Sequence, residues 1–185
     1  MKVYKMKKFF VMAVLLAAFS VFAKNPLPGQ YDQPILITSA GQSADVSLAG
    51  TLLKKLNLNF KVANLAKESD LSGIKTLVIV PGFSSKGLGA AGISREKELE
   101  RVQLILKAAK AKGIKVVMLH LGGKARRGAQ SDDLCQMAAN ASSLMIVVKQ
   151  GDEDQFFTKL AAQKKVPIKV IAKMADALTP LKEAF

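Results

Sequence analysis

Six short runs of apolar residues recur along the chain. In several of them both the odd and the even positions are apolar, so both faces of a strand would be apolar. The runs lie at 34–38, 60–63, 76–80, 114–119, 143–148 and 168–171. Continuous apolar runs of this length are typical of parallel strands that helices cover on both sides. The pattern therefore predicts a parallel sheet buried between two helical layers.

Four stretches between these runs carry apolar residues at helical spacing. They lie at 43–56, 94–112, 131–141 and 152–164, and each begins at a residue that can cap a helix, namely Ser43, Ser94, Ser131 and Asp152. The alternation predicts a three-layer α/β sandwich with a mostly parallel sheet of five or six strands, flavodoxin-like or Rossmann-like. Two strand orders fit. We favour the flavodoxin-like order 2-1-3-4-5 with a sixth strand added over the wider dinucleotide-fold order.

The first residues have the pattern of a signal peptide. Four lysines precede an apolar core at 9–19, and the small-residue sequence Val-Phe-Ala ends at position 23. The apolar core is too short to span a bilayer, which takes about 20 residues. We expect residues 1–23 to be a signal peptide, 24–185 to form a single α/β domain, and the mature protein to be periplasmic or secreted and not membrane-spanning.

The chain is strongly basic, and its formal net charge is +14. Loss of residues 1–23 removes four lysines and no acid, which leaves +10. Such a charge fits nucleic acid, an anionic surface or simple solubility. The chain has no tryptophan, and Tyr31 is the one tyrosine after position 23, so we find no aromatic platform on which bases could stack. We therefore expect no nucleic-acid partner.

One cysteine, Cys135, is present, so no internal disulfide can form. It lies one position from Leu134 on an apolar helical stripe with Met137 and Ala138. A buried structural thiol is therefore the favoured interpretation, and a nucleophile or redox centre is the alternative.

Three loops that follow strand-like runs are rich in glycine, small hydroxyl residues and cations, and contain no carboxylate. They span 38–43, 81–92 and 120–128. In the favoured strand order these loops leave the carboxyl ends of neighbouring strands, where open α/β sheets bind ligands. Backbone amides and cations suit a small anion. The predicted ligand-binding residues are Ser39, Gly41, Gln42, Ser43, Ser84, Ser85, Lys86, Gly87, His120, Gly123, Lys124, Arg126 and Arg127.

Each loop also has a structural explanation. In the first, Gly41 can make a turn and Ser43 can cap a helix. The second is too long for a minimal strand-to-helix turn, so we expect a binding loop or a lid, with a merely flexible loop as the alternative. In the third, Arg126 and Arg127 can grip a carboxylate or phosphate. Asp132 and Asp133 are expected to stabilise a helix dipole or, alternatively, to pair with these arginines.

The same residues allow a catalytic hypothesis. His120, the only histidine, could act as a general base toward Ser39, Ser43, Ser84 or Ser85. No G-x-S-x-G elbow exists, and no acid is obviously placed to orient the imidazole. No metal site is expected, because one histidine and one apolar-stripe cysteine do not make a ligand set.

The first loop partly matches the flavodoxin phosphate loop T-x-T-G-x-T, at Thr38, Gly41 and Ser43, and departs from it at Ala40. A flavin needs an aromatic wall, and only Phe83 is placed to offer one. The chain has no G-x-x-x-x-G-K-[ST] order either. We therefore expect no cofactor, and FMN is a disfavoured alternative.

The chain also resembles an uncharacterised domain-of-unknown-function family of exported bacterial proteins. The resemblance rests on T-S-A-G-Q-S-A-D (38–45), S-S-K-G-L-G-A-A-G-I-S (84–94) and G-G-K-A-R-R-G-A-Q-S-D (122–132). It implies a signal peptide and a small α/β domain, and no established activity.

The residues favour an exported protein that binds a small carboxylate- or phosphate-bearing ligand and could deliver it to a membrane transporter. A hydrolase or transferase that uses His120 and a loop serine is one alternative. A basic interaction module that docks an anionic partner or surface is another. An enzyme is the less favoured class.

Overall fold

The computed structural model describes residues 29–185. The expected signal peptide, residues 1–23, lies outside them. Six strands form a single sheet: β1 (Ile35–Ala40), β2 (Phe60–Val62), β3 (Thr76–Pro81), β4 (Lys115–His120), β5 (Leu144–Val148) and β6 (Ile168–Ile171). The ends of each strand lie within two residues of the ends of a predicted apolar run.

All strand pairs are parallel, and the sheet order is β2-β1-β3-β4-β5-β6. This order confirms the flavodoxin-like prediction with a sixth strand added beyond β5. Because every strand runs the same way, the loops after β1, β3 and β4 leave the same edge of the sheet. The chain reverses its direction of winding between β1 and β3, which places the first two loops side by side.

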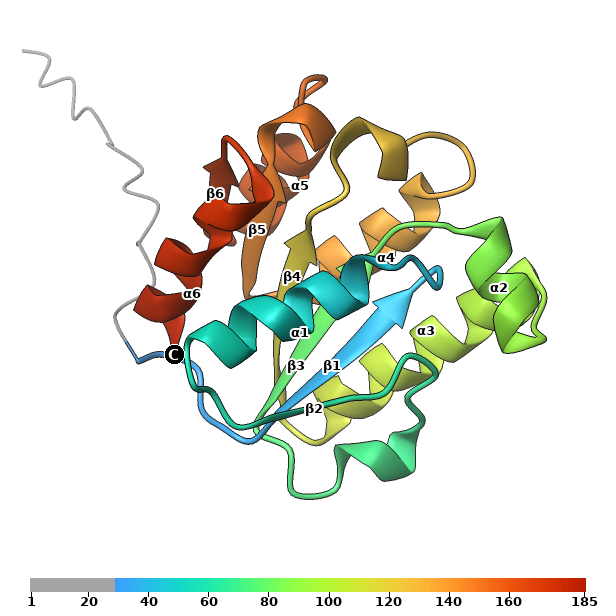
Figure 1. Cartoon of the computed structure of the whole chain (residues 1–185), viewed down its shortest axis with the longest axis horizontal. Coiled ribbons are helices and arrows are strands. Elements are labelled where there is room, and N and C mark those ends of the chain that lie inside the picture. The colour runs from blue at the N-terminus through green and yellow to red at the C-terminus, as the bar shows by residue number, and fades with distance from the viewer. Residues whose placement is uncertain (1–28) are drawn as a thin grey trace, which may run out of the picture.

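Helices cover both faces of the sheet (Figure 1). They are α1 (Asp45–Lys55), α2 (Ser85–Ala91), α3 (Arg95–Ala111), α4 (Asp132–Ala141), α5 (Phe156–Lys164) and α6 (Leu178–Ala184). Four short 3₁₀ segments are η1 (Glu68–Leu71), η2 (Gly123–Arg126), η3 (Lys149–Gly151) and η4 (Met174–Ala177). The apolar residues of α1 and α6 pack on one face of the sheet, and those of α3, α4 and α5 pack on the other.

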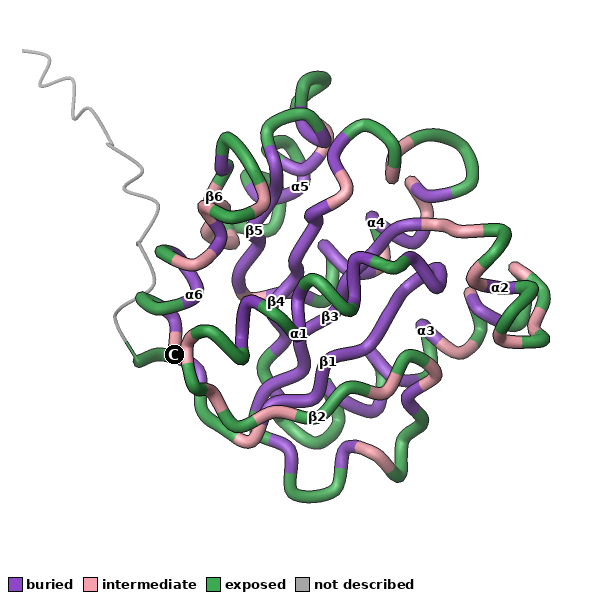
Figure 2. Tube along the Cα trace, in the orientation of Figure 1, coloured by how far each residue is buried: buried purple, intermediate pink, exposed green. Residues whose placement is uncertain are grey.

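The strands alternate between these two cores. Ile35 and Ile37 of β1 belong to the core under α1, and Leu36 and Ala40 belong to the core under α3. Every residue of β1, β3 and β5 is buried, so burial is concentrated along the central strands (Figure 2). Burial on both faces explains why the strands appear in the sequence as continuous apolar runs.

Two helices depart from the predictions. The glycine-rich segment, predicted as a loop or lid, contains α2, because Ser84 caps it by accepting a hydrogen bond from Gly87 N at 3.1 Å. The C-terminal helix α6 was not expected, since its apolar positions are few and it begins near Pro180. Within residues 29–185, none of the helices combines the length and the apolar character that a membrane crossing requires.

Candidate functional site

The first two predicted loops are joined directly by backbone hydrogen bonds. Gly82 N donates to Ala40 O and Ser84 N donates to Gly41 O, both at 2.8 Å. Gly41 has φ +112°, and a Cβ there would lie 2.5 Å from Gly82 O. Glycine at position 41 is therefore required by the close approach of the two loops.

Helix α2 packs against the first loop with the same closeness. A Cβ on Gly87 would overlap the carbonyl of Gln42. Gln42 is itself buried and has φ 59°. These two predicted site residues are thus brought together, and they fill the junction between the loops with protein atoms.

A buried carboxylate of α3 accepts hydrogen bonds from polar groups of the first loop. Glu98 is fully buried, and its Oε1 accepts hydrogen bonds from Gly41 N at 2.7 Å and Gln42 Nε2 at 3.0 Å. Arg101 pairs with the same carboxylate through Nε at 2.8 Å and also donates to the Ser39 carbonyl at 2.6 Å. The Gly41 amide, predicted to bind a ligand, is therefore occupied by the protein's own anion.

The candidate serines differ in their surroundings. Ser39 and Ser43 are buried, and their hydroxyl oxygens have no hydrogen-bond partner. Ser84 caps α2, whereas Ser85 and its neighbour Lys86 are exposed in the first turn of that helix. Buried polar groups without partners are rare in proteins and often mark functional regions.

His120 lies fully buried at the end of β4, and neither of its ring nitrogens contacts a serine. Nε2 lies 3.2 Å from the Arg126 carbonyl oxygen, Nδ1 has no hydrogen-bond partner, and the ring packs on Phe157 at 4.8 Å between centroids. Burial lowers the pKa of His120 below its ordinary value, although the Arg126 carbonyl acts in the opposite direction. A ring that is buried and contacts no serine hydroxyl disfavours His120 as a general base toward the loop serines.

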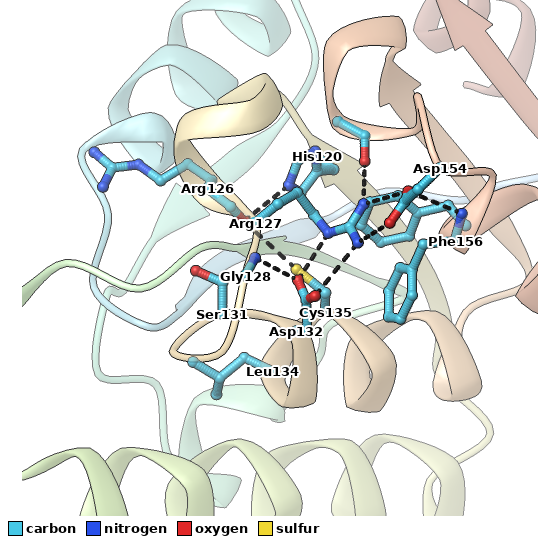
Figure 3. A network of polar contacts seen from close by, with 12 residues as sticks. His120, Arg126, Arg127, Gly128, Ser131, Asp132, Leu134, Cys135, Asp154 and Phe156 are labelled. Atoms are coloured by element: carbon cyan, nitrogen blue, oxygen red, sulfur yellow. Dashed lines mark hydrogen bonds and ion pairs between the residues drawn. The ribbon is translucent and has the colours of Figure 1, made fainter.

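The guanidinium of Arg127 is surrounded by protein groups that bind it (Figure 3). Its guanidinium pairs with Asp132 at 2.7 Å and with Asp154 at 2.9 Å, donates to the Gly151 carbonyl, and stacks on Phe156. Burial opposes the charge, but the two carboxylates outweigh it and raise the pKa of Arg127. The hydrogen bond from Arg127 lowers the pKa of Asp154 to about 2. Pairing of Asp132 with an arginine, predicted as the alternative, is observed.

Arg126 points the opposite way from Arg127 (Figure 3) and contacts the segment after β3 and the first turn of α1. Its Nη1 donates to the Phe83 carbonyl at 3.0 Å, and its Nε lies 3.5 Å from Asp45 Oδ2. Its aliphatic stem lies against Gly82 and Gly122, where a Cβ would meet it. The side chain is 27 % exposed, and Nη2 has no partner among residues 29–185. Arg126 therefore presents a partly solvent-accessible cation where the loops meet.

Two exposed lysines lie in the chain segments that form the junction at Arg126. Lys124 belongs to η2 together with Arg126, and Lys86 lies three residues after Phe83. Neither lysine forms an ion pair within the described part of the chain. Gly123, also predicted, is buried and takes φ 56° against the Gln150 side chain, so its role is to turn the backbone.

A cavity of about 420 Å³ lies beside this junction, over the loops that follow β4 and β5. It is lined by Lys124, Arg127, Gly128, Asp132, Gln150, Gly151, Glu153 and Asp154. Three carboxylates face two cations in it, and Arg127 is already paired with two of the three. The charge of this cavity therefore disfavours a small anion, in contrast to the surface at Arg126.

Cys135 and Asp133 have structural positions. Cys135 is fully buried, and burial raises the pKa of its thiol to about 12. Asp133 pairs with Arg95 of α3. Residues 29–185 contain no group of three or more histidine, cysteine, aspartate or glutamate side chains placed to hold a metal ion.

Sequence reasoning missed Asp154, in the turn before α5, which pairs with Arg127, and three polar residues that come from helices. Asp45, Glu98 and Arg101 bring two carboxylates and a guanidinium to loops that contain no carboxylate of their own. The Glu98 and Arg101 spacing of three residues is a recognisable ion pair on a helix, but nothing in the sequence shows that its face turns toward the loop after β1.

The described residues form one parallel sheet in the flavodoxin-like order, covered by helices on both faces, with a polar junction at its carboxyl edge. The sequence profile of the DUF6305 family, described as a domain of unknown function, matches residues 32–185. The chain belongs to this family, which confirms the resemblance to a domain-of-unknown-function family. No curated protein matches the sequence.

Several solved structures are similar to the chain at low sequence identity. Hydroxyethylthiazole kinase from Pyrococcus horikoshii OT3 is 12% identical with a TM-score of 0.51, over 76% of this chain and 58% of the kinase chain. A GDSL-like lipase from Bacteroides thetaiotaomicron VPI-5482 is 11% identical with a TM-score of 0.35, over 72% of this chain and 65% of the lipase. A putative acylhydrolase from Bacteroides fragilis NCTC 9343 is 12% identical with a TM-score of 0.35, over 79% of this chain and 71% of the acylhydrolase. The chain spans less than two thirds of the kinase and the lipase, and the likeness to the kinase is one of fold alone.

Proposed function

We propose that this protein is an exported binding protein for a small carboxylate- or phosphate-bearing ligand, which it holds at Arg126. The observation that carries the proposal is the position of this guanidinium. The guanidinium donates to Phe83 after β3 and lies near Asp45 at the start of α1, and its Nη2 has no hydrogen-bond partner among residues 29–185. The aliphatic stem lies against Gly82 and Gly122, so the side chain is fixed between the segments after β3 and β4. Arginine donors that project from a rigid junction are suited to carboxylate and phosphate oxygens.

The local charge supports the same ligand class. Asp45 balances the formal charge of Arg126, while Lys86 and Lys124 add two unpaired cations in the adjoining turns. Glu98 adds no net repulsion, because Arg101 pairs with it inside the fold. The proposal assigns no ligand contact to Arg127, whose donors are taken by Asp132, Asp154 and Gly151.

The hydrolase alternative has less support from the contacts. It needs an imidazole within hydrogen-bond reach of a serine hydroxyl. Nε2 of His120 instead lies near the Arg126 carbonyl, Nδ1 has no hydrogen-bond partner, and Ser84 is engaged as a helix cap.

The test is a calorimetric titration of the purified protein with inorganic phosphate and with succinate, at two ionic strengths. Arg126→Gln should weaken binding about tenfold or more, the expected loss of a hydrogen bond to a charged group. Lys112→Gln is the matched control, because Lys112 is exposed at the far end of α3 and pairs only with Glu68 at 3.6 Å.

Arg127→Gln separates binding from folding. It should lower the free energy of unfolding by about 1–3 kcal/mol, because it breaks a half-buried network, while the folded fraction keeps its phosphate affinity. Equal phosphate binding by the parent and a folded Arg126→Gln variant would contradict the proposal.

A further inference from the structure

A second concavity lies at the opposite edge of the sheet, where β4 and β5 begin. It opens between α3 and α4 and has a volume of about 740 Å³, within the range of about 300–1,000 Å³ that is usual for small-molecule sites. Its lining is Gln103, Leu106, Lys107, Lys110, Gly113, Ile114, Lys115, Val116, Met137, Asn140, Ala141 and Ser143. We call it the α3–α4 groove.

The floor of the α3–α4 groove is apolar. Leu106, Ile114 and Val116 form part of the core under α3, and Met137 packs against that core while remaining half-buried. A methionine wall can adapt to ligands of varied shape. An apolar group placed in the groove would remove this surface from water, which is the main driving force for binding at such sites.

The rim of the groove carries cations and no acid. Lys107, Lys110 and Lys115 line it, and none of the lining residues is aspartate or glutamate. Lys107 and Lys110 form no ion pair within residues 29–185. Lys115 donates to the Gln30 carbonyl at 2.6 Å and lies 5.5 Å from the ring centroid of Tyr31. Uncompensated lysines around an apolar floor favour a ligand with a negative head and an apolar body.

The groove on the other flank of α3 has a different character. It lies beside η1 and has a similar volume of about 710 Å³, but Glu68 and Glu100 stand among its cations. The absence of acids is therefore a property of the α3–α4 groove and not of the whole α3 surface. Lys107 lines both grooves, so Lys110 is the more specific residue of the two.

We propose that the α3–α4 groove is a binding site for a free amphipathic anion, a molecule with one carboxylate or sulfonate on a single apolar body. This site shares no residue with the junction at Arg126 and lies at the other edge of the sheet. A test of this groove therefore does not decide whether the proposed small-anion site exists, and the reverse also holds.

The experiment compares two fluorescent probes that share an apolar body. 1-Anilinonaphthalene-8-sulfonate is an anion and N-phenyl-1-naphthylamine is neutral. The purified protein should bind the sulfonate saturably, about tenfold more tightly than the amine, because only the sulfonate pairs with the lysines. Equal or tighter binding of the neutral amine overturns the proposal.

Paired variants locate the probe. The double variant Lys107→Gln/Lys110→Gln should weaken the sulfonate by about tenfold and leave the amine unchanged. The control Lys54→Gln/Lys164→Gln removes the same charge from the last turns of α1 and α5 and should bind both probes like the parent. All four lysines are exposed, so folding should persist, which far-ultraviolet circular dichroism checks. Loss of sulfonate binding in both double variants, or in neither, overturns the site.

A third measurement tests the competing occupant, a membrane surface. The protein is sedimented with phosphatidylcholine vesicles that contain phosphatidylglycerol. The parent is expected in the supernatant. Sedimentation that disappears in Lys107→Gln/Lys110→Gln overturns the proposal of a free ligand in favour of lipid docking.

Discussion

His120 should make the stability of this protein depend on pH between 5 and 7. It is the only histidine of the chain, so no other side chain with an ordinary pKa in this interval titrates. Burial lowers its pKa in the folded state, while the unfolded state keeps a value near 6.5. Below pH 6.5 the unfolded chain therefore binds more protons than the folded chain.

The sign and size follow from linkage. The stability that rests on a neutral His120 is complete above pH 6.5 and is lost as the pH falls from there toward the folded-state pKa. One proton gives a limiting slope of about 1.4 kcal/mol per pH unit. Two features of the structure explain this loss. Nδ1 has no hydrogen-bond partner, and the ring packs against Phe157 and Gly151, so a second proton on the imidazole would have no acceptor.

Urea unfolding at pH 7.5, 6.5, 5.5 and 5.0 measures this slope. His120→Gln, which does not titrate, should flatten the profile over this interval, whatever its effect on absolute stability. Identical slopes for the parent and the glutamine variant would refute the reasoning, because the pH dependence would then come from carboxylates.

Four further substitutions test the packing of the site. Cys135→Ser should lower the free energy of unfolding by about 1–3 kcal/mol, because it buries a hydroxyl in place of a thiol, and the native thiol should label slowly; rapid labelling of the folded protein would contradict burial. Glu98→Gln should cost about 3–5 kcal/mol in chemical denaturation, because Arg101 loses its buried counter-charge; a variant as stable as the parent would show that the ion pair is dispensable. Gly87→Ala should destabilise markedly, since its Cβ overlaps a carbonyl of the first loop, whereas Gly89→Ala, with open space around it, should be neutral or stabilising by up to about 1 kcal/mol; similar melting temperatures for the two variants would contradict the close contact between α2 and that loop.

The sequence predicts the layers well because the strand and helix patterns are local signals, whereas two strand orders fit these patterns and the choice between them rests on a preference for one fold. The run at 76–80 is apolar on both faces, as a central parallel strand must be, and β3 lies between β1 and β4. The region at 84–92 is predicted poorly because three glycines lower its helix propensity. The Ser84 cap and the packing of Gly87 on Gln42 outweigh that propensity, and the packing is a tertiary contact that no local pattern contains.

The sequence predicts which loops form the candidate site, but it does not predict the contacts between their side chains. The parallel direction of the strands brings the three loops to one edge, and the strand order makes them neighbours. The sequence cannot distinguish Arg126 from Arg127, because two adjacent arginines in a basic loop look equivalent. The structure separates them: Asp132 and Asp154 take the guanidinium of Arg127, and the side chain of Arg126 turns toward Phe83.

The most direct test of the anion site is a ¹H–¹⁵N correlation titration of the purified protein with inorganic phosphate, in the parent and in Arg126→Gln. The proposal predicts saturable shifts confined to the amides of Phe83 to Gly87 and Gly122 to Arg127, and their loss in the variant. Shifts spread over the lysines of α1, α3 and α5, or unchanged in Arg126→Gln, would contradict a specific anion site at the junction of the three loops.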